Sequence, residues 1–249
     1  MHDLLREREQ RHSDKLRRRA RNDATIDPRF VFFHLGKNGG GSVRQYLRPI
    51  RRTWVGAGHD ASLDSIAARW PGVPVSFFVR HPVSRFVSGY NNFRRAVIQN
   101  GTKRATNDDI IARSWFHTPN DLAEALASDD ERTLSAAHYA MSNLGFLSNP
   151  LTDNLHSPEV VDAYAGTIAF IGLFENFNTS VEGLRRTFDL PVELAIPTGD
   201  TAAHRSPRRL STRLSAVGQA AVLDWYRADL VLYEHCREIH LQQMEKLGL

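Results

Sequence analysis

A glycine-rich segment near the N-terminus has the composition of an anion-binding loop. It lies between an apolar run over residues 30–33 and a stretch with helical spacing over residues 43–47. Consecutive glycines let backbone N–H groups approach a phosphate, and a following helix adds the positive end of its dipole. We therefore predict an anion site here, with a lysine as its cation and a serine as a hydroxyl donor. The segment consists of Gly36, Lys37, Asn38, Gly39, Gly40, Gly41 and Ser42.

The glycine spacing also invites comparison with the phosphate loop of nucleoside-triphosphate enzymes. In that pattern, G-x-x-x-x-G-K-[ST], a lysine directly follows the second glycine. Gly36 and Gly41 have the required separation, but Ser42 stands where the lysine belongs. A small-molecule kinase therefore remains an alternative, although the cation that this chemistry needs is missing.

A second segment combines a strand-like run with basic and hydroxyl residues. Apolar residues 75–79 lead directly into Arg80, His81 and Pro82. Pro82 suits the first turn of a helix, and Ser88 lies about two turns further on, on the same face. An arginine at a strand end makes charge-assisted, bidentate contacts with phosphate. We predict a second phosphate contact at Arg80 and Ser88.

Taken in this order, the two segments resemble the donor site of sulfotransferases that use 3′-phosphoadenosine 5′-phosphosulfate (PAPS). The loop of the carbohydrate, membrane-associated branch reads roughly P-K-T-G-G-T-S. The chain matches its lysine, two glycines and serine, and departs at the proline (Gly36) and both threonines (Asn38 and Gly41). The family's 3′-phosphate segment is an apolar strand, R-D-P, then R-F and S-x-Y. The chain matches it except that His81 replaces the aspartate.

The resemblance implies sulfuryl transfer from PAPS to a hydroxyl or amine of a carbohydrate or small metabolite, without a metal. Lys37 would neutralise charge on the oxygens as the bond to sulfur breaks, as lysines do in phosphoryl transfer. N–H groups of residues 38–42 would hold the 5′-phosphate, and Arg80 and Ser88 the 3′-phosphate. Other family members use a late basic loop, for which Arg205 is the candidate here.

The acceptor's proton needs a base, and the chain has eleven histidines. The resemblance favours His59, because the carbohydrate branch carries a G-H pair after its second strand. An ordinary histidine titrates near pH ~6.5, which suits a general base at neutral pH. His117 and His138 are the alternatives, and we expect His34 to be a packing residue.

Two smaller likenesses lie later in the chain. Residues 170–177 resemble the family's I-G-x-x-E-x-F segment, and Asp229 with Tyr233 resembles the D-x-x-x-Y of its C-terminal helix. We expect Glu175 and Asp229 to support the site rather than to react.

Short apolar runs alternate with helical patterns along the chain. The alternation predicts an α/β fold, a three-layer sandwich with a mostly parallel central sheet, and the resemblance makes this a P-loop-like sulfotransferase fold. One helical pattern is expected over residues 120–147, and another over 178–188, opened by a capping box of Thr179 and Glu182. Over residues 211–247 the pattern is mostly helical, with Trp225 facing inward. Strands are expected over residues 30–33, 53–55, 75–79 and 167–173.

The composition is that of a globular protein. With 249 residues, 41% of them hydrophobic, the chain suits one domain over residues 28–249 after a charged arm over residues 1–27. The net charge of +4 fits an anionic ligand, and it leaves open a basic nucleic-acid-binding protein that uses the arm. Under the sulfotransferase interpretation we expect a small-molecule or glycan acceptor, and no nucleic acid.

The single cysteine and the hydropathy pattern bear on location. Cys236 alone excludes an intrachain disulfide and a multi-cysteine metal site. No run approaches the roughly 18 apolar residues of a membrane span, and the N-terminal residues lack the apolar core of a secretory signal. The expected location is therefore the cytoplasm. The resemblance implies that acceptor choice depends on residues 100–158, because variable loops and helices set it in this family.

Overall fold

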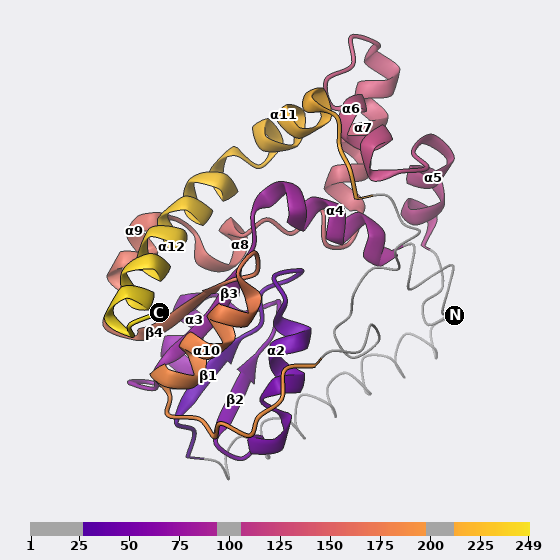
Figure 1. Cartoon of the computed structure of the whole chain (residues 1–249). Coiled ribbons are helices and arrows are strands. Elements are labelled where there is room, and N and C mark those ends of the chain that lie inside the picture. Colours follow the sequence, from indigo (N-terminus) through magenta and orange to yellow (C-terminus); the bar gives the residue numbers. More distant parts are fainter. Residues whose placement is uncertain (1–26, 94–105, 198–211) are drawn as a thin grey trace.

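A four-stranded parallel sheet forms the centre of the protein (Figure 1). The computed structural model describes residues 27–93, 106–197 and 212–249, and in this part the strand order is β2-β1-β3-β4. The strands are β1 (Phe30–Phe33), β2 (Trp54–Ala57), β3 (Val75–Val79) and β4 (Ile168–Leu173). The prediction of an α/β fold with a parallel sheet is confirmed.

The two central strands are buried on both faces. Every residue of β1 and β3 is buried, as expected for parallel strands covered by helices on each side. Phe33 pairs with Phe77, so the carboxyl ends of β1 and β3 lie side by side. The segments that follow these two strands therefore meet at one edge of the sheet.

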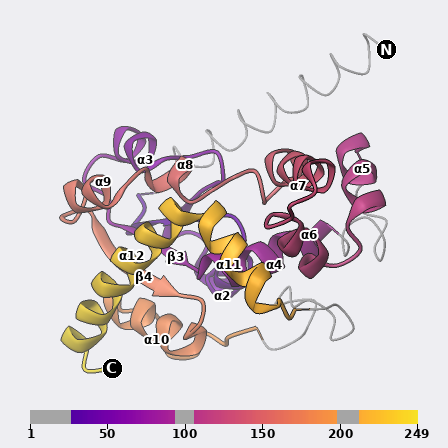
Figure 2. The same cartoon turned by 90° about the horizontal axis from the view of Figure 1, so that it is seen from above.

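Helices cover both faces of the sheet (Figure 2). Helices α2 (Gly40–Tyr46) and α10 (Phe177–Thr187) pack on the face that carries Phe32 and Phe78. The other face is covered by α3 (Leu63–Arg69), α8 (Thr152–Leu155) and α9 (Pro158–Ala163). A short 3-10 helix, η1 (Arg48–Ile50), follows α2. These layers give the expected sandwich.

The long C-terminal helix α12 (Arg227–Lys246) covers the edge strand β4. His240 Nδ1 lies 2.8 Å from the carbonyl oxygen of Ile171, and Gln243 Oε1 accepts a 2.9 Å hydrogen bond from the Ile171 N–H. Both backbone groups of this edge residue are therefore paired, which protects the edge from other strands. Cys236 is fully buried in this helix, and burial raises the pKa of its thiol to about 12.

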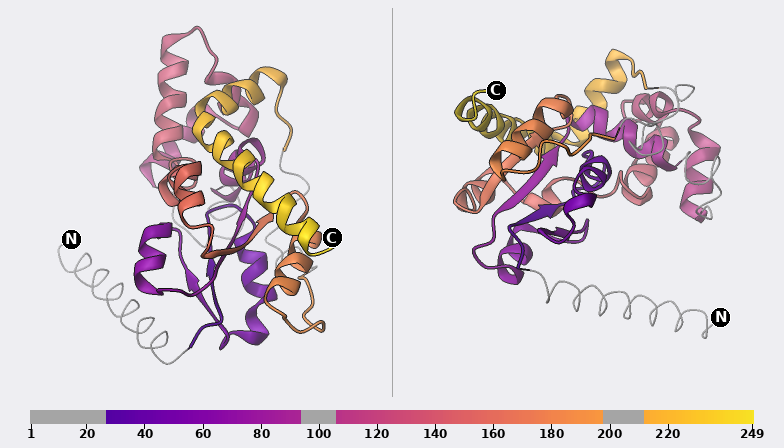
Figure 3. Two further views of the ribbon diagram at one scale, coloured as in Figure 1. Left: turned by 90° about the vertical axis from the view of Figure 1, so that its left-hand side faces the viewer. Right: turned by 60° about the horizontal axis from the view of Figure 1, so that its bottom comes forward.

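A second group of helices lies beyond the carboxyl ends of the strands (Figures 1 and 3). It has an apolar core of its own, which includes Phe86, Leu122, Met141 and Val222. The helices are α4 (Pro82–Phe93), α5 (Asn107–Trp115), α6 (Pro119–Ala125), α7 (Glu131–Asn143) and α11 (Ala216–Trp225).

Three sequence predictions are wrong in detail. The single helix over residues 120–147 is two helices, because Asp130 caps a new one by accepting a hydrogen bond from the Thr133 N–H. The capping box at residues 179 and 182 does not form, since α10 already begins at Phe177 and Glu182 pairs with two arginines instead. Trp225 is 37% exposed rather than turned inward.

Candidate active site

The glycine-rich loop turns sharply between β1 and α2. Lys37 and Gly39 both have left-handed backbones, with φ of 62° and 82°, and such a conformation favours glycine. A Cβ atom at Gly39 would also lie 2.6 Å from the ring of Phe174, and one at Gly40 would lie 2.0 Å from the ring of His34. Close packing therefore requires glycine at both positions.

The side chain of Lys37 is held by helix α4. Its Nζ donates a 3.0 Å hydrogen bond to Asn92 Oδ1 and lies 5.2 Å from the centroid of the Phe146 ring. Asn92 lies four residues after Ser88, so both side chains belong to one face of α4. Neither Asn92 nor Phe146 was predicted from the sequence. Of the two, only Asn92 has a signal in the sequence, because it lies four residues after Ser88.

Arg80 lies beside the loop, at the carboxyl end of β3. Its Nε donates to Ser84 Oγ (2.8 Å), its Nη1 donates to the Lys37 carbonyl oxygen (3.5 Å), and its guanidinium lies 3.9 Å from the centroid of Phe174. Burial lowers the pKa of Arg80 to about 10, with Glu175 opposing the shift. The group is therefore charged at neutral pH. The structure thus brings together Lys37 and Arg80, the two predicted cations.

Glu175 holds the turn between β3 and α4. Its Oε1 accepts hydrogen bonds of 3.0 Å from the His81 N–H and from Ser84 Oγ, and its Oε2 accepts one of 3.4 Å from the Tyr233 hydroxyl. The His81 ring packs edge-on against Tyr233, with centroids 5.3 Å apart. Glu175 therefore supports the turn that presents Arg80, as expected of a supporting residue.

His59 lies against the glycine-rich loop. Its ring centroid is 4.5 Å from that of His34 and 5.5 Å from that of Phe146. Its Nδ1 is buried, has no hydrogen-bond partner among the described residues, and lies 3.7 Å from where a Cβ of Gly36 would be. Burial lowers the pKa of His59, while a hydrogen bond to the backbone of His34 acts in the opposite direction.

The two alternative bases lie elsewhere, and His34 has the packing role that was expected. His117 is exposed, and its N–H donates to Asp121. His138 is also exposed and packs on Trp225, with centroids 5.2 Å apart. His34 is half-buried and fills the space between Gly40 and His59.

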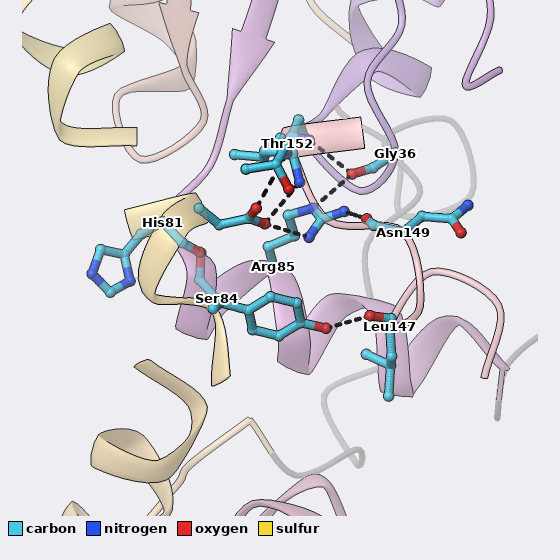
Figure 4. Close-up of polar contacts among 11 residues, drawn as sticks. Gly36, His81, Ser84, Arg85, Leu147, Asn149 and Thr152 are labelled. Atoms are coloured by element: carbon cyan, nitrogen blue, oxygen red, sulfur yellow. Dashed lines mark hydrogen bonds and ion pairs between the residues drawn. The ribbon is translucent and has the colours of Figure 1, made fainter. Parts of the chain in front are cut away.

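A buried ion pair ties the loop to the C-terminal helix (Figure 4). Arg85 Nε donates to the Gly36 carbonyl oxygen (3.2 Å), its Nη1 pairs with Asp229 Oδ2 (3.3 Å), and its Nη2 donates to the Asn149 carbonyl oxygen. Asp229 also accepts from the N–H groups of Leu151 and Thr152. Asp229 is thus a supporting residue, as expected.

Comparison with known protein families gives the wider assignment. The model of the sulfotransferase family matches residues 73–235, well over half of the chain. The chain belongs to the sulfotransferase family. Membership of this family makes the protein a transferase enzyme. The matched residues of this sulfotransferase include Arg80, Ser88, Glu175 and Asp229. No curated protein and no solved structure matches the chain significantly.

The remaining predicted site residues of the sulfotransferase have different surroundings. Asn38 is almost fully buried, and its Nδ2 donates to the Gly36 carbonyl oxygen at 2.8 Å, so this side chain closes the loop internally. Ser42 is buried in the first turn of α2, and Ser88 is half-buried on α4. Arg205 lies outside the described residues, as does the charged arm up to residue 26.

A surface cavity of about 420 Å³ lies between helix α7 and the junction of α11 and α12. It shares Asp229 with the buried ion pair, but no residue of the glycine-rich loop lines it. The lining residues are Met141, Ser142, Leu147, Ser148, Pro150, Thr152, Trp225, Tyr226, Ala228 and Asp229.

Two further properties of the described residues bear on function. Over residues 27–93, 106–197 and 212–249, no group of three or more His, Cys, Asp and Glu side chains is placed to hold a metal ion. In the same ranges, no helix is both long and apolar enough to cross a membrane.

Proposed function

We propose that this sulfotransferase takes its sulfuryl group from PAPS and transfers it in line to a hydroxyl or amine of a carbohydrate or small metabolite. The observation that carries the proposal is the proximity of Arg80 to the glycine-rich loop, where its Nη1 reaches the Lys37 carbonyl oxygen. Two cations beside the N-terminus of a helix fit a donor with several phosphate groups. The first turn of α2 contains no acidic residue that would oppose an anion.

Each phosphate of the donor would have matching groups in the protein. N–H groups of residues 38–42 and the Ser42 hydroxyl would hold the 5′-phosphate. Of these N–H groups, that of Ser42 also donates a 3.0 Å hydrogen bond to the Gly39 carbonyl oxygen. Arg80 and Ser88, with Arg205 from the late basic segment, would hold the 3′-phosphate. This second contact distinguishes the donor from ATP.

Lys37 and His59 would carry the transfer itself. The bond between sulfur and the oxygen of the 5′-phosphate breaks, and a bond forms between sulfur and the acceptor oxygen or nitrogen. Lys37 stabilises the negative charge on the leaving phosphate. His59 accepts the acceptor's proton, for which it must be neutral, and its lowered pKa keeps it so at pH 7.

The proposal extends to setting and organisation. Residues 28–249 would form one catalytic domain that works in the cytoplasm on a small-molecule or glycan acceptor, without a metal or nucleic acid. A single cysteine, which cannot form an intrachain disulfide, suits a reducing compartment.

Calorimetric binding of 3′-phosphoadenosine 5′-phosphate (PAP) tests this function, with 5′-AMP and ATP as competitors. We expect PAP to bind most tightly, and Arg80→Ala to lose about ten- to a hundredfold in affinity because a charge-assisted hydrogen bond is removed. Arg237→Ala, an exposed arginine on α12, is the matched control and should bind PAP like the wild type. A preference for ATP with Mg²⁺ would favour the kinase alternative.

A further inference from the structure

The ring of Phe146 lies against both proposed catalytic side chains. Its centroid is 5.2 Å from Lys37 Nζ and 5.5 Å from the His59 ring, which it meets edge-on at 80°. Its Cδ1 would lie 3.1 Å from a Cβ at Gly36, so the ring also packs on the glycine-rich loop. One aromatic side chain thus contacts both the lysine and the histidine.

The ring packs edge-on against His59, whose buried Nδ1 is the nitrogen that a proton must reach. The His59 ring makes a hydrogen bond to the backbone of His34, and this bond raises the pKa of His59. A bond that favours the protonated ring is one in which the ring donates, so the backbone group of His34 is the acceptor. Because Nδ1 has no hydrogen-bond partner among the described residues, that bond uses Nε2, and Nδ1 carries the lone pair of the neutral ring. An acceptor can bond to this buried atom only if a covering group moves.

The backbone on both sides of Phe146 is anchored, so a rearrangement here would involve its side chain. Leu144 and Leu147 are buried in the helical core, and the Tyr226 hydroxyl donates a 2.6 Å hydrogen bond to the Leu147 carbonyl oxygen. Phe146 itself is only half-buried. A change of its rotamer would uncover His59 without moving the chain.

We propose that Phe146 selects the acceptor. Its ring fills the acceptor's place between Lys37 and His59 and keeps water out. A molecule with a flat apolar face displaces the ring and binds in its place. Such a face, as on a sugar or an aromatic ring, would replace the contacts that the ring gives up. Water is small and has no such face, so it cannot replace the contacts that the ring loses when it is displaced. This inference rests on the proposed function.

The proposal predicts a side reaction that needs no knowledge of the acceptor. If water enters the site, its oxygen bonds to the sulfur of PAPS, the bond between sulfur and the 5′-phosphate oxygen breaks, and His59 accepts a proton from the water. The products are sulfate and PAP. Covering by Phe146 keeps this hydrolysis slow in the wild type.

Release of sulfate from ³⁵S-labelled PAPS, without any acceptor, tests the inference. We expect Phe146→Ala to hydrolyse PAPS at least about tenfold faster than the wild type, because general-base catalysis of a positioned water contributes a hundredfold or more. Phe146→Leu should give a smaller increase, since it keeps part of the cover. Adding His59→Gln to Phe146→Ala should abolish the increase. Trp115→Ala, an exposed aromatic residue on α5, is the matched control and should hydrolyse PAPS like the wild type.

Binding of PAP separates failure of this inference from failure of the proposed function. Variants that bind PAP like the wild type but hydrolyse PAPS no faster overturn the role of Phe146 and leave the donor site intact. An equal increase in Trp115→Ala would also overturn it. If the wild type itself does not bind PAP, the donor assignment fails, and the inference fails with it.

Discussion

Lys37 Nζ and Asn92 Oδ1 lie 3.0 Å apart, and this contact joins the glycine-rich loop to helix α4. The hydrogen bond fixes the direction of a long, flexible side chain that would otherwise sample many rotamers. Under the proposed function Lys37 stabilises the leaving phosphate, so its anchor should matter for the rate.

Asn92→Ala should therefore lower kcat by roughly tenfold while leaving PAP affinity nearly unchanged, because a misplaced catalytic group costs rate more than binding. Steady-state kinetics with PAPS and calorimetry with PAP measure the two effects. Asn143→Ala is the control, since the side chain of Asn143 donates to the Tyr139 carbonyl oxygen within α7, on its exposed side. A wild-type kcat in Asn92→Ala would show that the contact has no catalytic role.

The pH dependence of the reaction should reflect the burial of His59. A base must be unprotonated, and burial lowers the pKa of His59 below its ordinary value of 6.5. The acidic limb of the kcat/KM profile should therefore lie below pH 6.5, with activity constant from there through neutral pH. His59→Gln should remove the limb and lower kcat about a hundredfold or more, while His138→Gln should retain it. A limb that persists in His59→Gln would assign the base elsewhere.

The Gly40 position should be intolerant of any side chain because of one neighbour. A Cβ atom there would lie 2.0 Å from the His34 ring, and overpacking of this kind costs about 1–3 kcal/mol. We expect Gly40→Ala to lower the free energy of unfolding by that amount and to weaken PAP binding. Replacing His34 by Ala in the same chain should recover most of both losses. Gly166→Ala, where a Cβ meets nothing within 4 Å, is the control.

The sequence predicts best those parts of the site that depend on neighbouring residues. The strands over residues 30–33 and 75–79 are short, apolar and aromatic, so both their existence and the placement of Lys37 and Arg80 after them follow from local pattern. Adjacent parallel strands then bring the two cations together. The break between α6 and α7 also depends on a nearby residue, the cap at Asp130. It was not predicted because the apolar spacing of the sequence continues across Asp130.

Contacts between residues far apart in the sequence could not be predicted in this way. Phe146 reaches Lys37 and His59 from a loop more than eighty residues away, and nothing in its own neighbourhood marks it. Asn92 carries one weak signal, its spacing of four residues from Ser88, but an asparagine on a helix is most often a surface residue. Such contacts depend on how the second group of helices docks on the sheet, which no short pattern encodes.

The pair of Arg85 and Asp229 should be the most costly ion pair to break. Both side chains are almost fully buried, with 4% and 2% exposure, so removal of one partner leaves the other charge buried and uncompensated. We expect Arg85→Ala to lower the free energy of unfolding by about 3–5 kcal/mol. Arg237→Ala breaks an exposed pair with Glu234 and should cost at most about 1 kcal/mol. Urea denaturation measures both values.

Loss of this pair should also reach the donor site, because Arg85 Nε holds the Gly36 carbonyl oxygen. We expect Arg85→Lys, which keeps a charge opposite Asp229 but cannot reach three partners at once, to be more stable than Arg85→Ala and still to bind PAP more weakly than the wild type. Full PAP affinity in Arg85→Lys would limit the role of Arg85 to stability. A loss of affinity with little loss of stability would show that the guanidinium sets the position of the loop.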